Sequence, residues 1–331
     1  MACIALSLLQ LGALAAAAAP APSRPTVIEW VRQMPEAEIG PIGISESSCG
    51  DGSGLYLTDS VGEGALLLAV PMSAALSLEG AVGNPSIGAG LEACRCSDGD
   101  RAALAGLLAH ERLLCEGGPG SWYHPYVTSL PEIARGDAHV LYWSADEVAL
   151  LAGTSAHDEC LKLRSEVEGA IASLTAGALA GLVGIHGEAA VAGRVRDAYV
   201  SVFSRSFSMT AEANNIVRDG AWEDVLCLVP ALDMLQHSDQ PSVRYTYERT
   251  PSGAKRIEAR AIRPLEAGTE LSISCARDRP ACTRPPRVRA TAPHARDRPP
   301  CTRSPHTEGR SSGPRSALAG RGGAPLLRNV R

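Results

Sequence analysis

The sequence lacks several motifs on which common enzyme classes depend. It contains no P-loop and no complete G-x-G-x-x-G, so nucleotide binding of those two types has no support. Its G-x-S-x-G at residues 309–313 has no strand before it and no helix after it, so we interpret it as a chance match rather than a hydrolase elbow. Aromatic residues make up only 4% of the chain, but an apolar content of 45% supports a globular core.

The ten cysteines are scattered, and none forms a C-x-x-C pair. Cys94 and Cys96 are separated by one residue, which is too tight for the usual zinc spacing. Several cysteines fall on apolar helix faces, which favours buried thiols. A zinc site or a disulfide framework is therefore the minor hypothesis, and no metal is expected.

No Lys or Arg precedes Arg24, so the N-terminus lacks the charged region of a secretory signal. Residues 1–19 are nevertheless almost all apolar or small and end in a run of Ala, as in a secretory or plastid targeting segment. We interpret residues 1–24 as a targeting or disordered segment; without cleavage, the protein would remain in the cytoplasm or nucleus. The run is too short and too rich in Ala for a membrane span.

The formal net charge of −5 hides an asymmetry along the chain. Residues 276–331 contain 13 Arg, no Lys and three acidic residues, so a basic tail follows an acidic body. Residues 276–286 recur as residues 295–305 in an Arg/Pro-rich repeat that cannot bury a core, which predicts a disordered tail. One hypothesis is a wrong reading frame or splice boundary after about residue 274. The rival hypothesis is a tail that contacts RNA or anionic surfaces by charge alone, with no specific nucleic-acid recognition.

Apolar residues at helical spacing predict a helical middle region. Residues 100–115 form one such helix, and Glu111 on its apolar stripe is expected to be a hydrogen-bonded core acid. Further helices are predicted at residues 27–34, 157–184 and 189–206. Ser144 and Glu147 form a capping box at the start of another helix. Residues 73–99 are expected to be a connector of small residues.

Short strands are predicted on both sides of this helical region. Residues 55–61 and 65–70 flank a Gly-Glu-Gly turn, which predicts a hairpin. Later strands are predicted at residues 225–229, 243–248, 255–262 and 269–275. The pattern therefore indicates small sheets rather than one long sheet.

Polar residues are bunched directly after the predicted strand at residues 225–229. Asp233, Gln236 and His237 follow it within a few positions, and functional sites often lie in such places. A short helix with a capped Asp and one polar His is the plainer alternative.

The order of these segments resembles the SET-domain methyltransferases of the Rubisco large-subunit lysine methyltransferase type. The likeness is carried by residues 49–71, residues 122–131, S-R-S-F-S at 204–208, V-P-A-L-D-M-L-Q-H-S at 229–238, and A-G-T-E-L-S-I-S-C at 267–275. It implies an α+β fold, with a SET domain of small β-sheets at residues 25–275. A helical insert at about residues 100–208 would split this domain, and the tail at residues 276–331 would follow it.

The resemblance implies that S-adenosylmethionine is the cofactor and that the activity is protein-lysine N-methyltransfer, although one branch of the family methylates histidine. The implied cofactor contacts are Asp51, Gly52, Ser53, Gly54, Arg205, Gln236 and His237. Arg205 and Asp233 are also assigned to the substrate; a cation offsetting the dipole at a helix C-terminus is the plainer interpretation of Arg205. The expected partner is a protein that presents a lysine to a monomeric enzyme without a membrane span.

The chain departs from the family pattern at two positions. Gln236 replaces the usual Asn, and its extra methylene would weaken a hydrogen bond at a cost on the order of 1 kcal/mol. Cys275 stands at the catalytic position where the family has the Tyr of the methyl-transfer channel, and a thiol is a poorer donor than a phenol. We also do not expect residues 276–331 to form the family's C-terminal helical substrate-binding domain.

These departures lead us to expect impaired transfer and leave two alternatives. The first is a catalytically inactive SET-like module that binds a partner protein. The second is an interaction protein that acts through its basic tail.

Overall fold

The computed structural model describes residues 26–48, 52–116, 118, 120–132, 139–209 and 225–274. All of them belong to one compact unit, Met1–Thr283, whereas the second unit, Arg284–Arg331, lies outside the described residues. The predictions for the N-terminal segment, Asp51, Cys275 and the Arg-rich tail also fall outside them.

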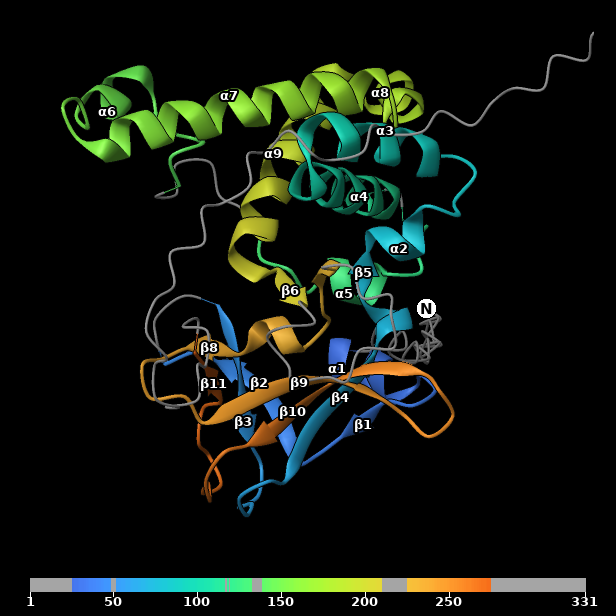
Figure 1. Ribbon diagram of the computed structural model, residues 1–331, viewed down its shortest axis with the longest axis vertical. Helices are drawn as coiled ribbons and strands as arrows, with labels where there is room; N and C mark the ends of the chain where they lie inside the picture. Colours follow the sequence, from blue (N-terminus) through green and yellow to red (C-terminus); the bar gives the residue numbers. More distant parts are fainter. Residues whose placement is uncertain are drawn as a thin grey trace, which may run out of the picture. The chain divides into compact units, whose positions relative to one another are not determined.

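Small sheets form one part of the described unit, and helices form the other (Figure 1). The largest sheet has four strands in the order β1-β4-β10-β9, and each neighbouring pair is antiparallel. Its strands are β1 (Glu38–Ile39), β4 (Leu66–Pro71), β10 (Lys255–Ala261) and β9 (Val243–Arg249). Strands from the two ends of the SET-like region thus pair at the sheet centre, where Ile257 lies opposite Val70.

Three smaller sheets complete the β part. In the first, β2 (Ile42–Glu46) pairs antiparallel with β3 (Ser53–Leu57). In the second, β5 (Leu76–Ser77) and β6 (Phe207–Met209) flank β7 (Val225–Leu228). In the third, β8 (Gln236–His237) pairs parallel with β11 (Ser272–Ile273).

The predicted hairpin between residues 55–61 and 65–70 is wrong, because its two strands join different sheets. β3 pairs with β2, whereas β4 lies between β1 and β10. The turn between them meets a distant segment instead, since Gly64 N donates to Ala261 O at 2.8 Å. Alternation shows that a strand forms, but it does not show which strand will be its partner.

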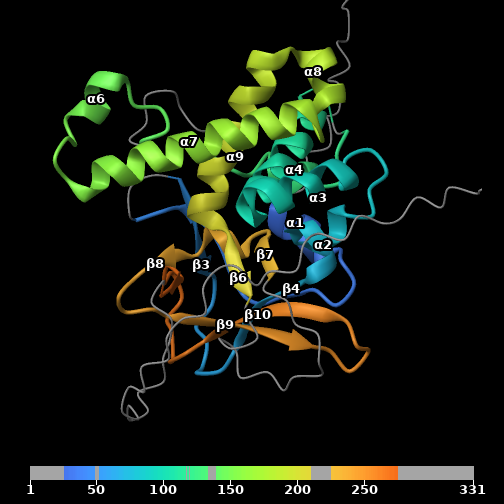
Figure 2. The ribbon, with the colours of Figure 1, turned by 45° about the horizontal axis from the view of Figure 1, so that its top comes forward.

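The helices surround α4, which packs against α3, α5, α7 and α9. Their bounds are α1 (Val27–Arg32), α2 (Leu78–Ala81), α3 (Gly88–Asp98), α4 (Asp100–Cys115), α5 (His124–Val127), α6 (Ala145–Ala149), α7 (Ser155–Ala176), α8 (Ala180–His186) and α9 (Glu188–Arg205). Figure 2 shows α7 running across α9, with α6 at its far end. Most side chains of α4 are buried, so this helix forms the centre of the helical part.

Three helix predictions are confirmed, and two others need correction. The helices predicted at residues 27–34, 100–115 and 189–206 are α1, α4 and α9, and the Ser144 capping box is present. Residues 73–99 are not a mere connector, because they contain β5, α2 and α3. The helix predicted at residues 157–184 is two helices, α7 and α8, bent by 87° at their junction.

The prediction for Glu111 is also confirmed. Its buried carboxylate accepts a hydrogen bond from the Ser121 hydroxyl and lies 2.9 Å from His110 Nδ1.

None of the described helices alone is both long and apolar enough to cross a bilayer. α7 and α8 reach the required length and composition only as a bent pair.

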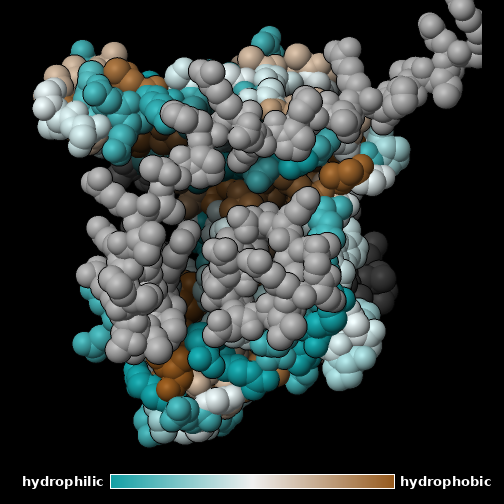
Figure 3. Space-filling model, viewed as in Figure 1, coloured by the Kyte–Doolittle hydropathy of each residue, from teal (hydrophilic) through white to brown (hydrophobic). Residues whose placement is uncertain are grey.

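The apolar core is continuous from the sheets into the helices. It includes Leu68 of β4, Leu104 of α4 and Val195 of α9, each fully buried. Figure 3 shows apolar residues exposed to view in a band where the helical part meets the rest.

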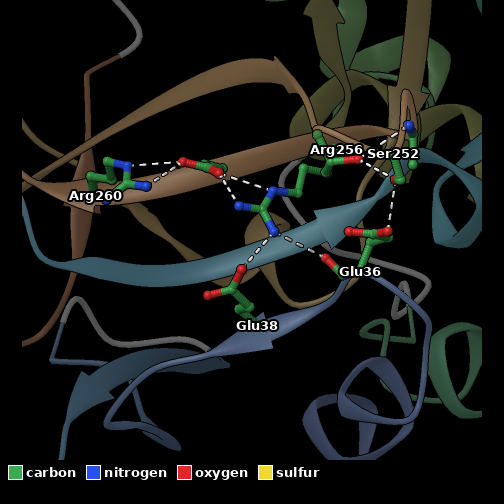
Figure 4. A network of polar contacts seen from close by, with 8 residues as sticks. Glu36, Glu38, Ser252, Arg256 and Arg260 are labelled. Atoms are coloured by element: carbon green, nitrogen blue, oxygen red, sulfur yellow. Dashed lines mark hydrogen bonds and ion pairs between the residues drawn. The ribbon is translucent and has the colours of Figure 1, made fainter.

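A buried acid ties the strands of the largest sheet together. Glu258 on β10 is 5% exposed, and it accepts hydrogen bonds from Arg256 Nε and Arg260 Nε at 2.9 Å each. Arg256 also reaches Glu38 of β1 at 2.6 Å (Figure 4). Because a buried charge must be paired, this network favours the register that brings these side chains together.

Candidate functional site

One buried residue joins the two stretches that carry the SET-like motifs. Leu271 N donates to Leu55 O of β3 at 2.8 Å, and Leu271 O accepts from Gln236 N of β8 at 3.2 Å. β11 then continues this contact, with Ile273 opposite His237 in a parallel pair. β3 is therefore held in the same small region as β8 (Figure 1).

The glycines at the start of β3 have different surroundings. Gly52 has a φ of 90°, and nothing lies within 4 Å of the place where a Cβ would stand. A Cβ on Gly54 would instead lie 2.4 Å from Glu270 Oε1. The Cβ position of Gly52 is therefore empty, whereas Gly54 is small because a carboxylate occupies the adjacent space.

Asp233 is the buried polar centre of this region. Its side chain is 1% exposed and accepts a hydrogen bond from the Tyr126 hydroxyl at 2.9 Å. Arg205, at the end of α9, donates from Nη1 to the Asp233 carbonyl oxygen at 3.0 Å and lies 3.6 Å from its carboxylate. Burial raises the pKa of Asp233 to about 6, although Arg205 and Tyr126 favour the ionised form.

A strained turn places Asp233 in this position. Ala231 precedes the 3-10 turn η2 (Leu232–Met234) with a φ of 65°, a value that is uncommon for a residue with a side chain. The turn is closed by Asp233 N, which donates to Val229 O at 3.1 Å. Strain of this kind is often found at functional sites, where the surrounding structure maintains it.

The remaining predicted site residues line the outer side of the same region. Gln236 is half-buried, and both His237 and Ser53 are exposed. Asp51 and Cys275 lie outside the described residues. The structure thus brings Gly52 to Gly54, Arg205, Asp233 and β8 into one region, while their roles there remain predictions.

Local sequence patterns do not reveal the contacts of two residues in this region, Tyr126 and Glu270. Tyr126 is fully buried and lies 107 positions before its partner Asp233. Burial, together with the nearby Asp233 carboxylate, raises its pKa well above the usual value for tyrosine. The only sequence signal for Tyr126 is its place in the family-like stretch at residues 122–131. Glu270 likewise lies within a family-like motif, but nothing in that motif shows which groups it contacts.

Burial dominates the chemistry of three cysteines in the described region. Cys94, Cys160 and Cys227 are free and buried, as their apolar surroundings predict. Burial raises the pKa of Cys94 and of Cys227 to about 12, which disfavours the reactive thiolate. Within the described residues, no group of three His, Cys, Asp or Glu is arranged to hold a metal ion.

Comparison with known proteins identifies the fold. No family model matches the sequence, and no curated protein matches it either. The solved SET domain of LSMT bound to lysine and AdoHcy matches with a TM-score of 0.56 at 15% identity, covering 75% of this chain and 52% of that one. Rubisco LSMT bound to AdoMet matches with a TM-score of 0.51 at 16% identity, covering 75% and 51%.

The described chain therefore has the SET-domain fold of Rubisco LSMT, with helices and small antiparallel sheets, as the sequence motifs predict. It spans about half the length of the solved structures that it matches.

Proposed function

We propose that this chain is an S-adenosylmethionine-dependent protein-lysine N-methyltransferase. The observation that carries the proposal is the pair of hydrogen bonds through Leu271, which hold β3 beside β8. The fold adds support, since solved proteins with this fold were captured with AdoMet, or with lysine and AdoHcy.

The described residues fit this cofactor. Gly52 has positive φ and an empty Cβ position, and the half-buried Gln236 offers a side-chain amide on β8. Arg205 supplies a guanidinium that would pair with a carboxylate. When bound, S-adenosylmethionine supplies a methyl group on a sulfonium, which a neutral lysine amine can attack.

The side chains of Asp233, Arg205 and Tyr126 would orient the reactants. Asp233 engages Arg205 through both its carbonyl and its carboxylate, which limits the orientations of the guanidinium. Tyr126 fixes the carboxylate from the opposite element, α5. Fixed orientation can supply much of the rate in a two-reactant transfer.

Transfer itself is tested with methyl-labelled S-adenosylmethionine and the proteins of a cell extract, followed by amino-acid analysis. We expect label on lysine Nζ, and Cys275→Tyr should increase it because a phenol is the better donor in the channel. Label on histidine alone would contradict the lysine assignment.

A second candidate is a catalytically inactive SET-like module that binds a partner protein. The residue at position 275 favours it, because a thiol stands where the family has the channel Tyr. In that case, both the wild type and Cys275→Tyr would bind S-adenosylmethionine but transfer no label.

A further inference from the structure

We infer that Glu270 is a positioning residue for the proposed cofactor site, because its carboxylate fastens the end of β2 to the start of β3, where Gly52 and Gly54 lie. The identity of the ligand rests on the proposed function, whereas the contacts of the Glu270 carboxylate are independent of it.

Three donors at the end of β2 converge on the Glu270 carboxylate. The Ser47 hydroxyl donates to Oε1 at 2.7 Å, and the Ser48 backbone N–H donates to Oε2 at 3.2 Å. The Ser48 hydroxyl also donates to Oε2. Ser47 is 6% exposed, so one of these contacts is shielded from water.

The start of β3 lies against the same carboxylate. Oε1 fills the space where a Cβ of Gly54 would stand, and Tyr56 forms a backbone bridge with Glu270. The Tyr56 hydroxyl accepts from Ser48 N at 3.0 Å, which adds a second tie across the hairpin. Ser47 N closes the turn by donating to Gly52 O at 2.9 Å.

The charge of Glu270 matters for these contacts. Partial burial acts to raise the pKa of Glu270, but hydrogen bonds from Ser48 and Ser47 lower it overall, so the group is ionised at neutral pH. A carboxylate accepts on both oxygens, whereas an amide accepts on only one. In Glu270→Gln the negative charge is lost, and an amide NH₂ facing Ser47 would force that hydroxyl to accept instead of donate, so weaker neutral hydrogen bonds replace the charge-assisted ones.

Strand pairing alone does not require this carboxylate. β2 and β3 already pair in continuous register from Ile42 opposite Leu57 to Glu46 opposite Ser53. Glu270 acts beyond that ladder, beside the hydrogen bond from Ser47 N to Gly52 O. Its effect is therefore expected on ligand affinity more than on folding.

The test is calorimetric titration of the full chain with S-adenosylmethionine. Glu270→Gln should raise the Kd by roughly fivefold or more, with little change in the melting temperature. Glu266→Gln is the matched control: Glu266 is an exposed carboxylate on the same segment that accepts from the Ser60 hydroxyl at 2.9 Å. In turnover, Glu270→Gln should raise the KM for the cofactor and leave kcat nearly unchanged.

Equal affinity of the wild type and Glu270→Gln would overturn the inference. A wild-type chain that does not bind would overturn the proposed function, and with it the role of Glu270 in binding. Amide hydrogen exchange separately tests whether Glu270 fastens the end of β2 to the start of β3. Glu270→Gln, but not Glu266→Gln, should accelerate exchange at the Ser47 and Ser48 amides, and unchanged exchange would show that the carboxylate does not fasten the turn.

Discussion

At the scale of single residues, Asp233 is an acid whose side chain is almost fully buried. Its pKa is raised to about 6 from an ordinary 3.8, so between these values the folded chain keeps a proton that the unfolded chain releases. The stability contributed by this group is full below the lower value and is lost as the pH rises through the upper one.

Asp233→Asn cannot ionise and should remove this dependence. The unfolding free energy of the wild type, relative to that of Asp233→Asn, should fall by roughly 2 kcal/mol as the pH rises from about 4 to about 7. Denaturant titration of both proteins at the two pH values measures the difference. A difference that stays constant or grows would contradict the assignment.

The Tyr126 hydroxyl is the donor that Asp233 receives from α5. Tyr126→Phe leaves a buried carboxylate with one donor fewer, and it should cost roughly 1–3 kcal/mol of unfolding free energy. Tyr123→Phe is the control, because its hydroxyl donates at 3.3 Å to a neutral carbonyl, that of Ala75, and should cost about 1 kcal/mol or less. Equal losses of unfolding free energy in the two variants, measured by chemical denaturation, would show that the hydrogen bond to the Asp233 carboxylate contributes no more than one to a neutral carbonyl.

At the scale of elements, close helix packing depends on small residues. A Cβ on Gly90 of α3 would lie 2.6 Å from the backbone N and Cα of Ala178, at the junction of α7 and α8. Gly90→Ala should therefore destabilise the chain by about 1–3 kcal/mol, because backbone cannot move aside as a side-chain end can.

Gly181→Ala is the matched control within α8. Nothing lies within 4 Å of its Cβ position, so the gain in helix propensity should leave stability unchanged or raise it by up to about 1 kcal/mol. Thermal unfolding compares the two variants. A Gly90→Ala protein as stable as Gly181→Ala would contradict the packing of α3 against the α7–α8 junction.

The elements that the sequence predicts well are those defined by local signals. The apolar stripe of α4 and the capping box at Ser144 are visible in a single stretch of chain. α3 was missed because its buried side is built largely from small residues, including Gly88 and Cys94. The β3–β4 hairpin was wrong because β3 pairs with the strand before it, β2, while β4 lies between β1 and β10, which comes from far along the chain.

The candidate site was predictable only in part, for the same reason. The family-like motifs indicated Arg205, Asp233 and β8, and the structure places them in one region. The contacts that organise the region span much greater distances: Tyr126 to Asp233 crosses 107 positions, and Glu270 to Ser47 crosses 223. No local pattern encodes such pairings, because they form only when the sheets assemble.

At the scale of the whole molecule, the fold survives at an identity of only 15–16% to its solved neighbours. Within this chain, backbone pairing brings β3 and β8 to the same segment, which contains Leu271 and β11. A ligand between these strands would contact residues from both ends of the SET-like region. Binding is therefore expected to depend on residues far apart in the sequence.

Calorimetric titration with S-adenosylmethionine tests this claim most directly, using the wild type, Arg205→Ala, His237→Ala and, as a control, His157→Ala on α7. The account predicts one cofactor per wild-type chain, with affinity reduced about tenfold or more in Arg205→Ala and in His237→Ala but not in His157→Ala; tenfold corresponds to about 1.4 kcal/mol. No binding by the wild type, or equal affinity in all four proteins, would contradict it.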